Sequence, residues 1–167
     1  GTIAGAIPNA TTLFIDDGTD GVDATFCTVT NGTSSVFNLN VTIEDQTCSM
    51  GGGTFQQNIS LHADDANPGN TVTLQGALNV TGDMDFFHNI TLSTGSHNIT
   101  ITNTSTPTLE LNNSLLENPT SPEVATISLG SGSTLTVQSG TSSSVHLGNG
   151  SMPNAIGTIV TATGATV

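Results

Sequence analysis

The amino-acid sequence predicts an all-β chain wound as a parallel β-helix, or β-solenoid, with coils of about 18 residues. Short triplets of the form apolar–polar–apolar recur at a nearly constant spacing, and small or polar turn-forming residues follow each one. The period of two within a triplet is typical of a half-buried strand, and the abundance of Thr, 30 of 167 residues, favours strands over helices. The alternative is an antiparallel β-sandwich, in which short strands also recur every 8–12 residues.

The repeat is clearest in the second half of the chain. Five triplets at a nearly constant spacing begin at Val72, Ile90, Leu109, Ile127 and Val145. Two earlier triplets, at Val41 and Ile59, have the same spacing. A second set of triplets lies about half a period away, at Leu78, Ile99 and Leu135. We expect the five main triplets to stack in one buried ladder, with successive coils about 4.8 Å apart.

The chain divides into three parts by this pattern. Residues 1–10 are an apolar, uncharged tail that we expect to act as a donor strand for a neighbouring molecule. Residues 11–60 are expected to form an N-terminal cap or a small β region, since the terminal repeats of solenoids are usually atypical. Residues 61–167 are expected to form the β-repeat body.

The charge balance excludes several functions. The chain has no Lys or Arg and 13 Asp plus Glu residues, which gives a formal net charge of −13. Without cations it cannot neutralise phosphates, so we expect no nucleic-acid partner and no binding to anionic lipid. The sequence contains no run of about 18 apolar residues, so it predicts no membrane-spanning segment.

Catalysis is not expected either. The chain has no Lys for a Schiff base or a P-loop and no G-x-S-x-G motif. Its four His residues have no zinc-site spacing. We therefore do not expect an enzyme.

Two features indicate an extracellular location. The numbering begins at Gly1 and not at Met, so we expect either that a signal peptide has been removed or that the chain is a fragment. The only cysteines, Cys27 and Cys48, are separated by slightly more than one coil of the repeat. They are therefore expected to form a disulfide bond, which requires an oxidising compartment.

N-glycosylation sequons are abundant. They cover 10 of the 16 asparagines, about twice the number that the Ser and Thr content gives by chance. The candidate sites are Asn9, Asn31, Asn40, Asn58, Asn79, Asn89, Asn98, Asn103, Asn112 and Asn149. We expect N-linked glycans at several of them, on an outward-facing surface.

One acidic turn is a candidate metal site. Asp16, Asp17, Asp20 and Asp23 lie close together in a short segment that also includes two glycines. Calcium prefers several oxygen ligands, but this spacing is not that of an EF-hand loop, so a solvated acidic turn is the alternative. If the chain binds a cofactor at all, calcium is the expected one.

The segment from Ile127 to Gly150 carries a family resemblance. It reads ISLGSGSTLTVQSGTSSSVHLGNG and resembles the low-complexity coils of parallel β-helix surface proteins, such as filamentous-haemagglutinin-like and autotransporter adhesins. That resemblance covers roughly residues 72–167 and implies a secreted or surface-displayed rod. A donor-strand pilin-like subunit, with a sandwich body, is the second choice.

These observations favour an extracellular structural subunit that assembles with copies of itself into a glycosylated surface filament, sheath or coat. The alternative is a binding solenoid, either a surface adhesin or an ice-binding protein with rows of Thr-x-Thr. Such pairs begin at Thr71, Thr100, Thr106, Thr134 and Thr161. They do not recur at the spacing of the repeat, so the sequence does not predict a flat Thr array.

Overall fold

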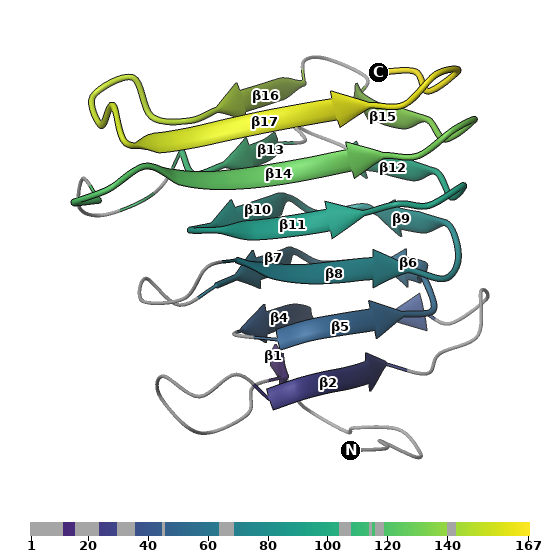
Figure 1. Cartoon of the computed structure of the whole chain (residues 1–167). Helices are drawn as coiled ribbons and strands as arrows, with labels where there is room; N and C mark the ends of the chain where they lie inside the picture. Colours follow the sequence, from purple (N-terminus) through teal and green to yellow (C-terminus); the bar gives the residue numbers. More distant parts are fainter. Residues whose placement is uncertain are drawn as a thin grey trace.

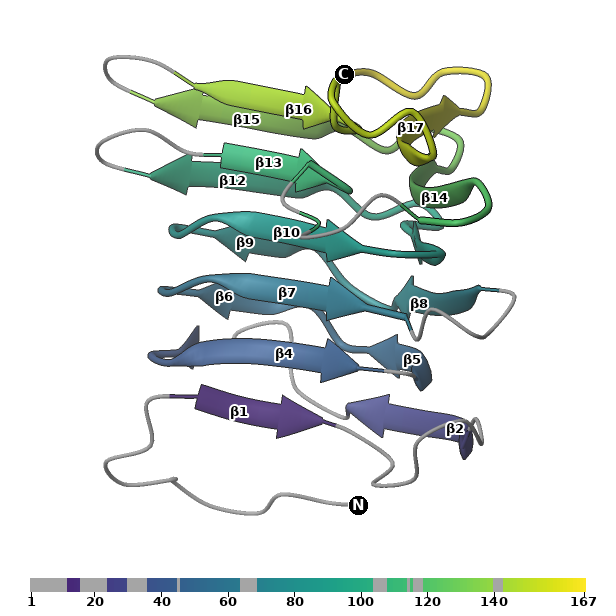
Figure 2. The same cartoon turned by 90° about the vertical axis from the view of Figure 1, so that its left-hand side faces the viewer.

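The structure is a computed structural model that describes residues 12–15, 24–29, 36–44, 46–63, 69–103, 108–113, 115, 119–139 and 143–167. These residues form strands, turns and connecting segments, arranged as three parallel sheets (Figures 1 and 2). Sheet A consists of β1 (Thr12–Ile15), β4 (Asn40–Glu44), β7 (Ile59–His62), β10 (Met84–Phe87), β13 (Thr108–Leu111) and β16 (Ser144–Leu147). Sheet B consists of β2 (Ala24–Val29), β5 (Gln46–Met50), β8 (Asn70–Leu74), β11 (Ile90–Ser93), β14 (Glu123–Leu129) and β17 (Ala155–Thr161). Sheet C consists of β3 (Val36–Phe37), β6 (Gly53–Phe55), β9 (Leu78–Val80), β12 (Ile99–Asn103) and β15 (Leu135–Ser139).

The sheet order confirms the parallel β-solenoid. Neighbouring strands in each sheet are three places apart in the chain order, so one strand from each sheet makes a coil. Figure 2 shows β4, β7, β10 and β13 lying one above another, each in a separate coil. All pairings between these strands are parallel, so the antiparallel β-sandwich is wrong.

The coil length is not constant along the chain. Val41 pairs with Ile59, at the spacing that the repeat predicts. Leu109, however, pairs with Val145, at twice that spacing. The core fixes the strands, whereas the connections between them lie outside it and tolerate insertions. The coil is therefore defined by its three strands and not by a residue count.

The expected single ladder of five triplets is consequently wrong. Val72 and Ile127 belong to sheet B, whereas Leu109 and Val145 belong to sheet A. Ile90 is in sheet B but pairs with Asn70 and not with Val72.

The second set of triplets forms a true ladder. Leu78, Ile99 and Leu135 stack in register along sheet C. Their two spacings in the sequence are unequal: the step from Leu78 to Ile99 does not fit the repeat, whereas the step from Ile99 to Leu135 is twice the repeat.

The segment expected to be an N-terminal cap or small β region joins the same three sheets. β1 and β4 open sheet A, β2 and β5 open sheet B, and β3 and β6 open sheet C. Residues 1–10, the expected donor strand, lie outside the described residues. No helix in the described part of the chain is long and apolar enough to cross a membrane.

Inward positions of the three sheets form one core of aliphatic side chains with a few aromatic ones. Ile59, Leu78, Ile99 and Leu109 are fully buried, and all belong to this cluster. Near the first coils the rings of Phe37 and Phe55 stack, with centroids 4.5 Å apart. Polar residues on the same strands point outward. This alternation of inward apolar and outward polar side chains explains the apolar–polar–apolar triplets in the sequence.

Candidate functional site

The last coil exposes apolar side chains that earlier coils bury. Leu109 and Leu111 on β13 are fully buried, whereas their register partners on β16, Val145 and Leu147, are 45% and 52% exposed. These two residues point in the core direction, since they continue an inward ladder. No strand among the described residues covers them, because β16 is the outermost strand of sheet A.

The last strand of sheet B and the segment after it also carry exposed apolar residues. β17 is the outermost strand of sheet B and carries Ile156 and Val160, both exposed, and Val167 follows it. Among the described residues, five of the six exposed large hydrophobics therefore lie at or after residue 145. The sixth, Val36, lies on β3 at the other end of sheet C. Ile156 and Val160 pair with Val124 and Ser128, so their side chains lie on the outer side of sheet B. We call the surface formed by Val145 and Leu147, on the inward side of the last strand of sheet A, the end face.

The end face is also uncharged. All 13 acidic residues of the chain precede residue 124, and the last of them is Glu123. The only titratable side chain after that point is His146, whose register partner is Glu110 on the outer surface of sheet A. An apolar surface without like charges adds no local like-charge repulsion when it contacts another copy of this chain, although the net charge of −13 still opposes close approach.

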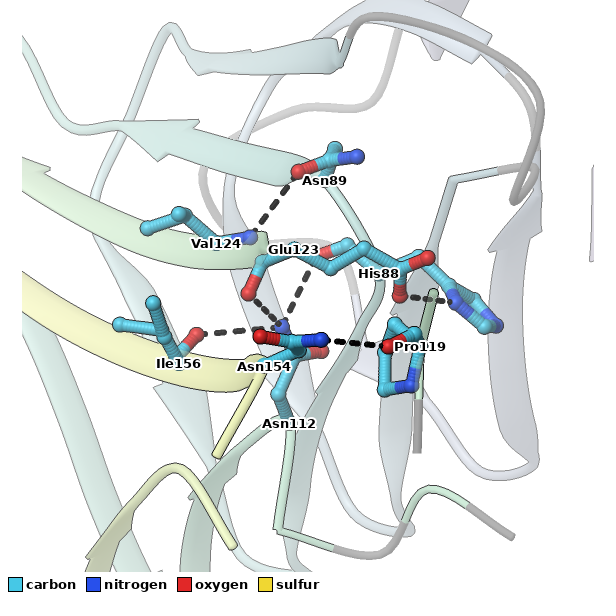
Figure 3. A network of polar contacts seen from close by, with 8 residues as sticks. All are labelled: His88, Asn89, Asn112, Pro119, Glu123, Val124, Asn154 and Ile156. Atoms are coloured by element: carbon cyan, nitrogen blue, oxygen red, sulfur yellow. Dashed lines mark hydrogen bonds and ion pairs between the residues drawn. The ribbon is translucent and has the colours of Figure 1, made fainter. Parts of the chain in front are cut away.

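A polar network joins three coils at the corner between sheets A and B (Figure 3). Asn112 follows β13 with a left-handed backbone, at φ 54°, and its side chain is fully buried. Its Nδ2 donates to the carbonyl oxygens of His88, Glu123 and Ile156 at 3.2, 3.1 and 3.1 Å. The amide therefore links the corners that follow β10, β13 and β16.

The same corner holds a short contact between a histidine and a carboxylate. His88 Nδ1 lies 2.8 Å from Glu123 Oε2, and the Glu123 side chain is 8% exposed. Asn89 Oδ1 accepts a hydrogen bond from the Val124 backbone N–H at 2.9 Å, so the turn after β10 is bound to the start of β14 (Figure 3). These contacts are structural, since they satisfy polar groups of the corner itself.

A second ladder of side-chain acceptors runs along the start of sheet A. Asn40 Oδ1 accepts from the Asn58 N–H at 3.2 Å, and Asn58 Oδ1 accepts from the Asp83 N–H at 3.0 Å. Asp83 Oδ1 then accepts from the Thr108 N–H at 3.0 Å. Each coil thus fixes the backbone of the next where a strand begins.

The outer surface of sheet A carries titratable groups with shifted pKa values. Burial and the carboxylates of Glu110 and Asp83 raise the pKa of Asp85 to about 6. Burial, assisted by His88, lowers the pKa of His62 to about 4. Glu44 favours the charged His62, but its carboxylate is 3.9 Å away, and burial against the Phe87 ring outweighs it. Among the described residues, no three His, Cys, Asp or Glu side chains come together to hold a metal ion.

The expected calcium ligands, Asp16, Asp17, Asp20 and Asp23, lie outside the described residues. Of the sequons, Asn9, Asn31 and the Asn103 side chain also lie outside the described part. Four sequon side chains are exposed: Asn40, Asn58, Asn79 and Asn98. Asn89 and Asn149 are partly buried.

Asn112 requires a correction, because its side chain is fully buried and its Nδ2 makes the three hydrogen bonds described above. Nδ2 is the atom to which an N-glycan is attached, so a glycan at Asn112 is incompatible with this structure. In the sequence Asn112 resembles the other sequons, and its burial depends on which coils meet at this corner.

The cysteines lie on adjacent strands of sheet B. Cys27 on β2 and Cys48 on β5 are register partners, and Cys48 is buried and disulfide-bonded. Neighbouring parallel strands are about 4.8 Å apart, within the range of Cα separations that a disulfide spans. The geometry is compatible with the Cys27–Cys48 bond, which we test below.

The fold defines the chain as a parallel β-solenoid with an exposed apolar end. Comparison with protein-family models, with curated proteins and with solved structures finds no match for this chain. Its function therefore has to be inferred from the surfaces described here.

Proposed function

We propose that the protein is an extracellular structural subunit that assembles head to tail into a glycosylated surface filament, sheath or coat. The observation that carries this proposal is the end face, with Val145 and Leu147 about half exposed on an inward ladder. Exposed apolar groups of this kind are typical of interaction surfaces. The occupant proposed for the end face is the first coil of a second copy.

Stacking of this kind preserves the geometry of the solenoid. β16 and β17 present outer edges whose backbone N–H and C=O groups have no strand partner in the described part of the chain. The first strands of another copy, β1 and β2, run in the same sense and open sheets A and B. Pairing across the junction continues the parallel sheets. Because the contact joins two different surfaces, the last coil of one copy and the first coil of the next, its repetition gives an open filament.

The tail of residues 1–10 is proposed to strengthen the junction as a donor strand. It is apolar and uncharged, as is the segment from Ile156 to Val167. Neither residue of the end face is an asparagine, so no N-glycan would be attached to the end-face side chains themselves. A loss of mass on enzymatic deglycosylation, with Asn112 unmodified, is expected for the natural protein.

A double variant on one strand tests the assembly. Val145→Asp with Leu147→Asp places two charges on the end face, whereas His146→Asp places a charge on the opposite side of the same strand. We expect filaments in electron micrographs of the wild type and of His146→Asp, and monomers for the double variant with an unchanged β-sheet circular dichroism spectrum. Deletion of residues 1–10 is expected to abolish assembly without unfolding the chain. A wild-type protein that stays monomeric at high concentration would contradict the proposal, and so would filaments of the double variant.

A further inference from the structure

The outer face of sheet B carries two regular ladders of hydroxyl side chains. The first contains only threonines: Thr47, Thr71, Thr91, Thr126 and Thr158. The second lies two residues further along each strand: Ser49, Thr73, Ser93, Ser128 and Val160. Each strand thus contributes a Thr-x-Ser, Thr-x-Thr or Thr-x-Val segment, and nine of the ten positions carry a hydroxyl group. We call these ten residues the hydroxyl face.

The sequence did not predict this array, because successive coils of sheet B differ in length. The inward ladder of the same sheet shows this, since the steps between its paired residues are all unequal: Cys48, Val72, Leu92, Ile127 and Ile159. The threonine pairs therefore follow no fixed period in the sequence. They are nevertheless in register in space, since all the length variation lies in the connections.

The hydroxyl face has a two-dimensional repeat. Adjacent strands place equivalent residues about 4.8 Å apart along the solenoid, and alternate residues on one strand are roughly 6.6 Å apart. The register continues from β5 through β8, β11 and β14 to β17 without a shift. Figure 1 shows these strands stacked and running in nearly the same direction. The result is a regular, flat grid of hydroxyl and methyl groups.

The hydroxyl face is also uncharged, and none of its ten residues is an asparagine, although Thr91 completes the sequon of Asn89. The only acidic residue on β5, β8, β11, β14 or β17 is Glu123, which is buried. By contrast, the outer side of sheet A carries Asp85, Glu110 and His146, and the outer side of sheet C carries the sequon residue Asn79.

We infer that the hydroxyl face binds ice. Its ligand must be neutral and flat, with hydrogen-bonding groups that repeat in two directions, and the surface of an ice crystal has these properties. Each Thr offers a hydroxyl group that donates and accepts and a methyl group that orders adjacent water. A sugar polymer is disfavoured, since the chain has no Trp or Tyr and the hydroxyl face has no Phe for stacking on sugar rings. A second copy is disfavoured because Ser and Thr are poor anchors of protein interfaces.

A bulky substitution in the grid tests this inference. Thr91→Tyr lies in the middle of the threonine ladder, and Thr100→Tyr is the matched control on the outer side of sheet C. Thermal hysteresis and partition into a growing ice hemisphere are the measurements. We expect both for the wild type and for Thr100→Tyr, and their loss for Thr91→Tyr. The unassembled Val145→Asp/Leu147→Asp variant should still bind ice, so that a failure of filament assembly and a failure of ice binding are separate results.

Three results would overturn the inference. The first is a wild-type protein that shows no hysteresis and is excluded from ice. The second is equal activity of Thr91→Tyr and the wild type. The third is wild-type binding to crystalline cellulose or chitin, lost in Thr91→Tyr, without ice binding, which would assign the hydroxyl face to a polysaccharide.

Discussion

At the scale of single residues, Asn112 is the most informative position. Its buried side-chain amide donates hydrogen bonds to carbonyl groups of three successive corners. Nothing in the repeat pattern of the sequence indicates this contact. Its left-handed backbone is one that Asn tolerates better than most residues. Sequence analysis treated it as a glycan acceptor, because a sequon carries no information about burial.

Two substitutions of Asn112 separate the effect of its hydrogen bonds from the effect of its left-handed backbone. Asn112→Ala removes the hydrogen bonds that Nδ2 donates to three carbonyl groups and keeps a Cβ in the left-handed region. We expect it to lower the free energy of unfolding by about 2–4 kcal/mol. Asn112→Gly loses the same bonds without the backbone strain, so its loss should be smaller. Chemical denaturation measures both, and an Asn112→Ala variant as stable as the wild type would show that the network contributes nothing.

Asp85 makes stability depend on pH. Its pKa is raised from 3.8 to about 6 in the folded chain, so the folded state holds the proton more tightly than the unfolded state. Stability contributed by this residue is complete below pH 3.8 and is lost as the pH rises to about 6. Asp85→Asn removes this loss. We expect it to stabilise the protein at pH 7 by about 1–2 kcal/mol, allowing for solvent screening, and to have little effect at pH 3. Urea titrations at both pH values test this, and an equal effect at the two would contradict it.

At the scale of strands, the alternation of apolar and polar residues predicted the strands, and the nearly constant spacing of the triplets favoured parallel coils over an antiparallel sandwich. Neither was sufficient to predict which strands are neighbours. The triplets at Val72 and Leu109 look alike in the sequence, yet they belong to different sheets. Connections outside the core carry no periodic signal, so the long coil from Leu109 to Val145 is indistinguishable in the sequence from two short ones. The threonine ladders of sheet B were missed for the same reason.

Leu109 and Val145, which belong to one ladder, show how much a covering coil contributes to stability. Leu109 is fully buried, and its register partner Val145 is 45% exposed. Leu109→Ala should cost about 2–5 kcal/mol of unfolding free energy. Val145→Ala should cost roughly 0.5 kcal/mol or less in the monomer, as surface substitutions do. Denaturation curves of the unassembled protein provide the comparison. Equal costs would mean that the last coil is as well covered as the one before it.

The strands β2 and β5 carry the disulfide prediction. A Cys27–Cys48 bond would close a loop of about 20 residues and stabilise the fold by on the order of 3 kcal/mol. The intact mass should not change when the denatured protein is alkylated without a reductant, and two labels should add after reduction. Labelling of both thiols without reduction would rule out the bond.

At the scale of the whole molecule, charge and apolar surface are separated along the solenoid axis. All acidic residues lie before residue 124, whereas five of the six exposed large hydrophobics among the described residues lie after residue 144. The composition predicted an acidic surface chain, but only the three-dimensional order of the coils places the apolar groups together on one end. That order is the basis of the proposed head-to-tail assembly.

Fibre diffraction from aligned filaments tests this assembly most directly. If subunits stack with their solenoid axes along the filament, the spacing between strands lies along the fibre. We therefore predict a reflection near about 4.8 Å on the meridian. A reflection of about 4.8 Å confined to the equator would mean that the strands run along the filament, and it would contradict head-to-tail stacking through the end face.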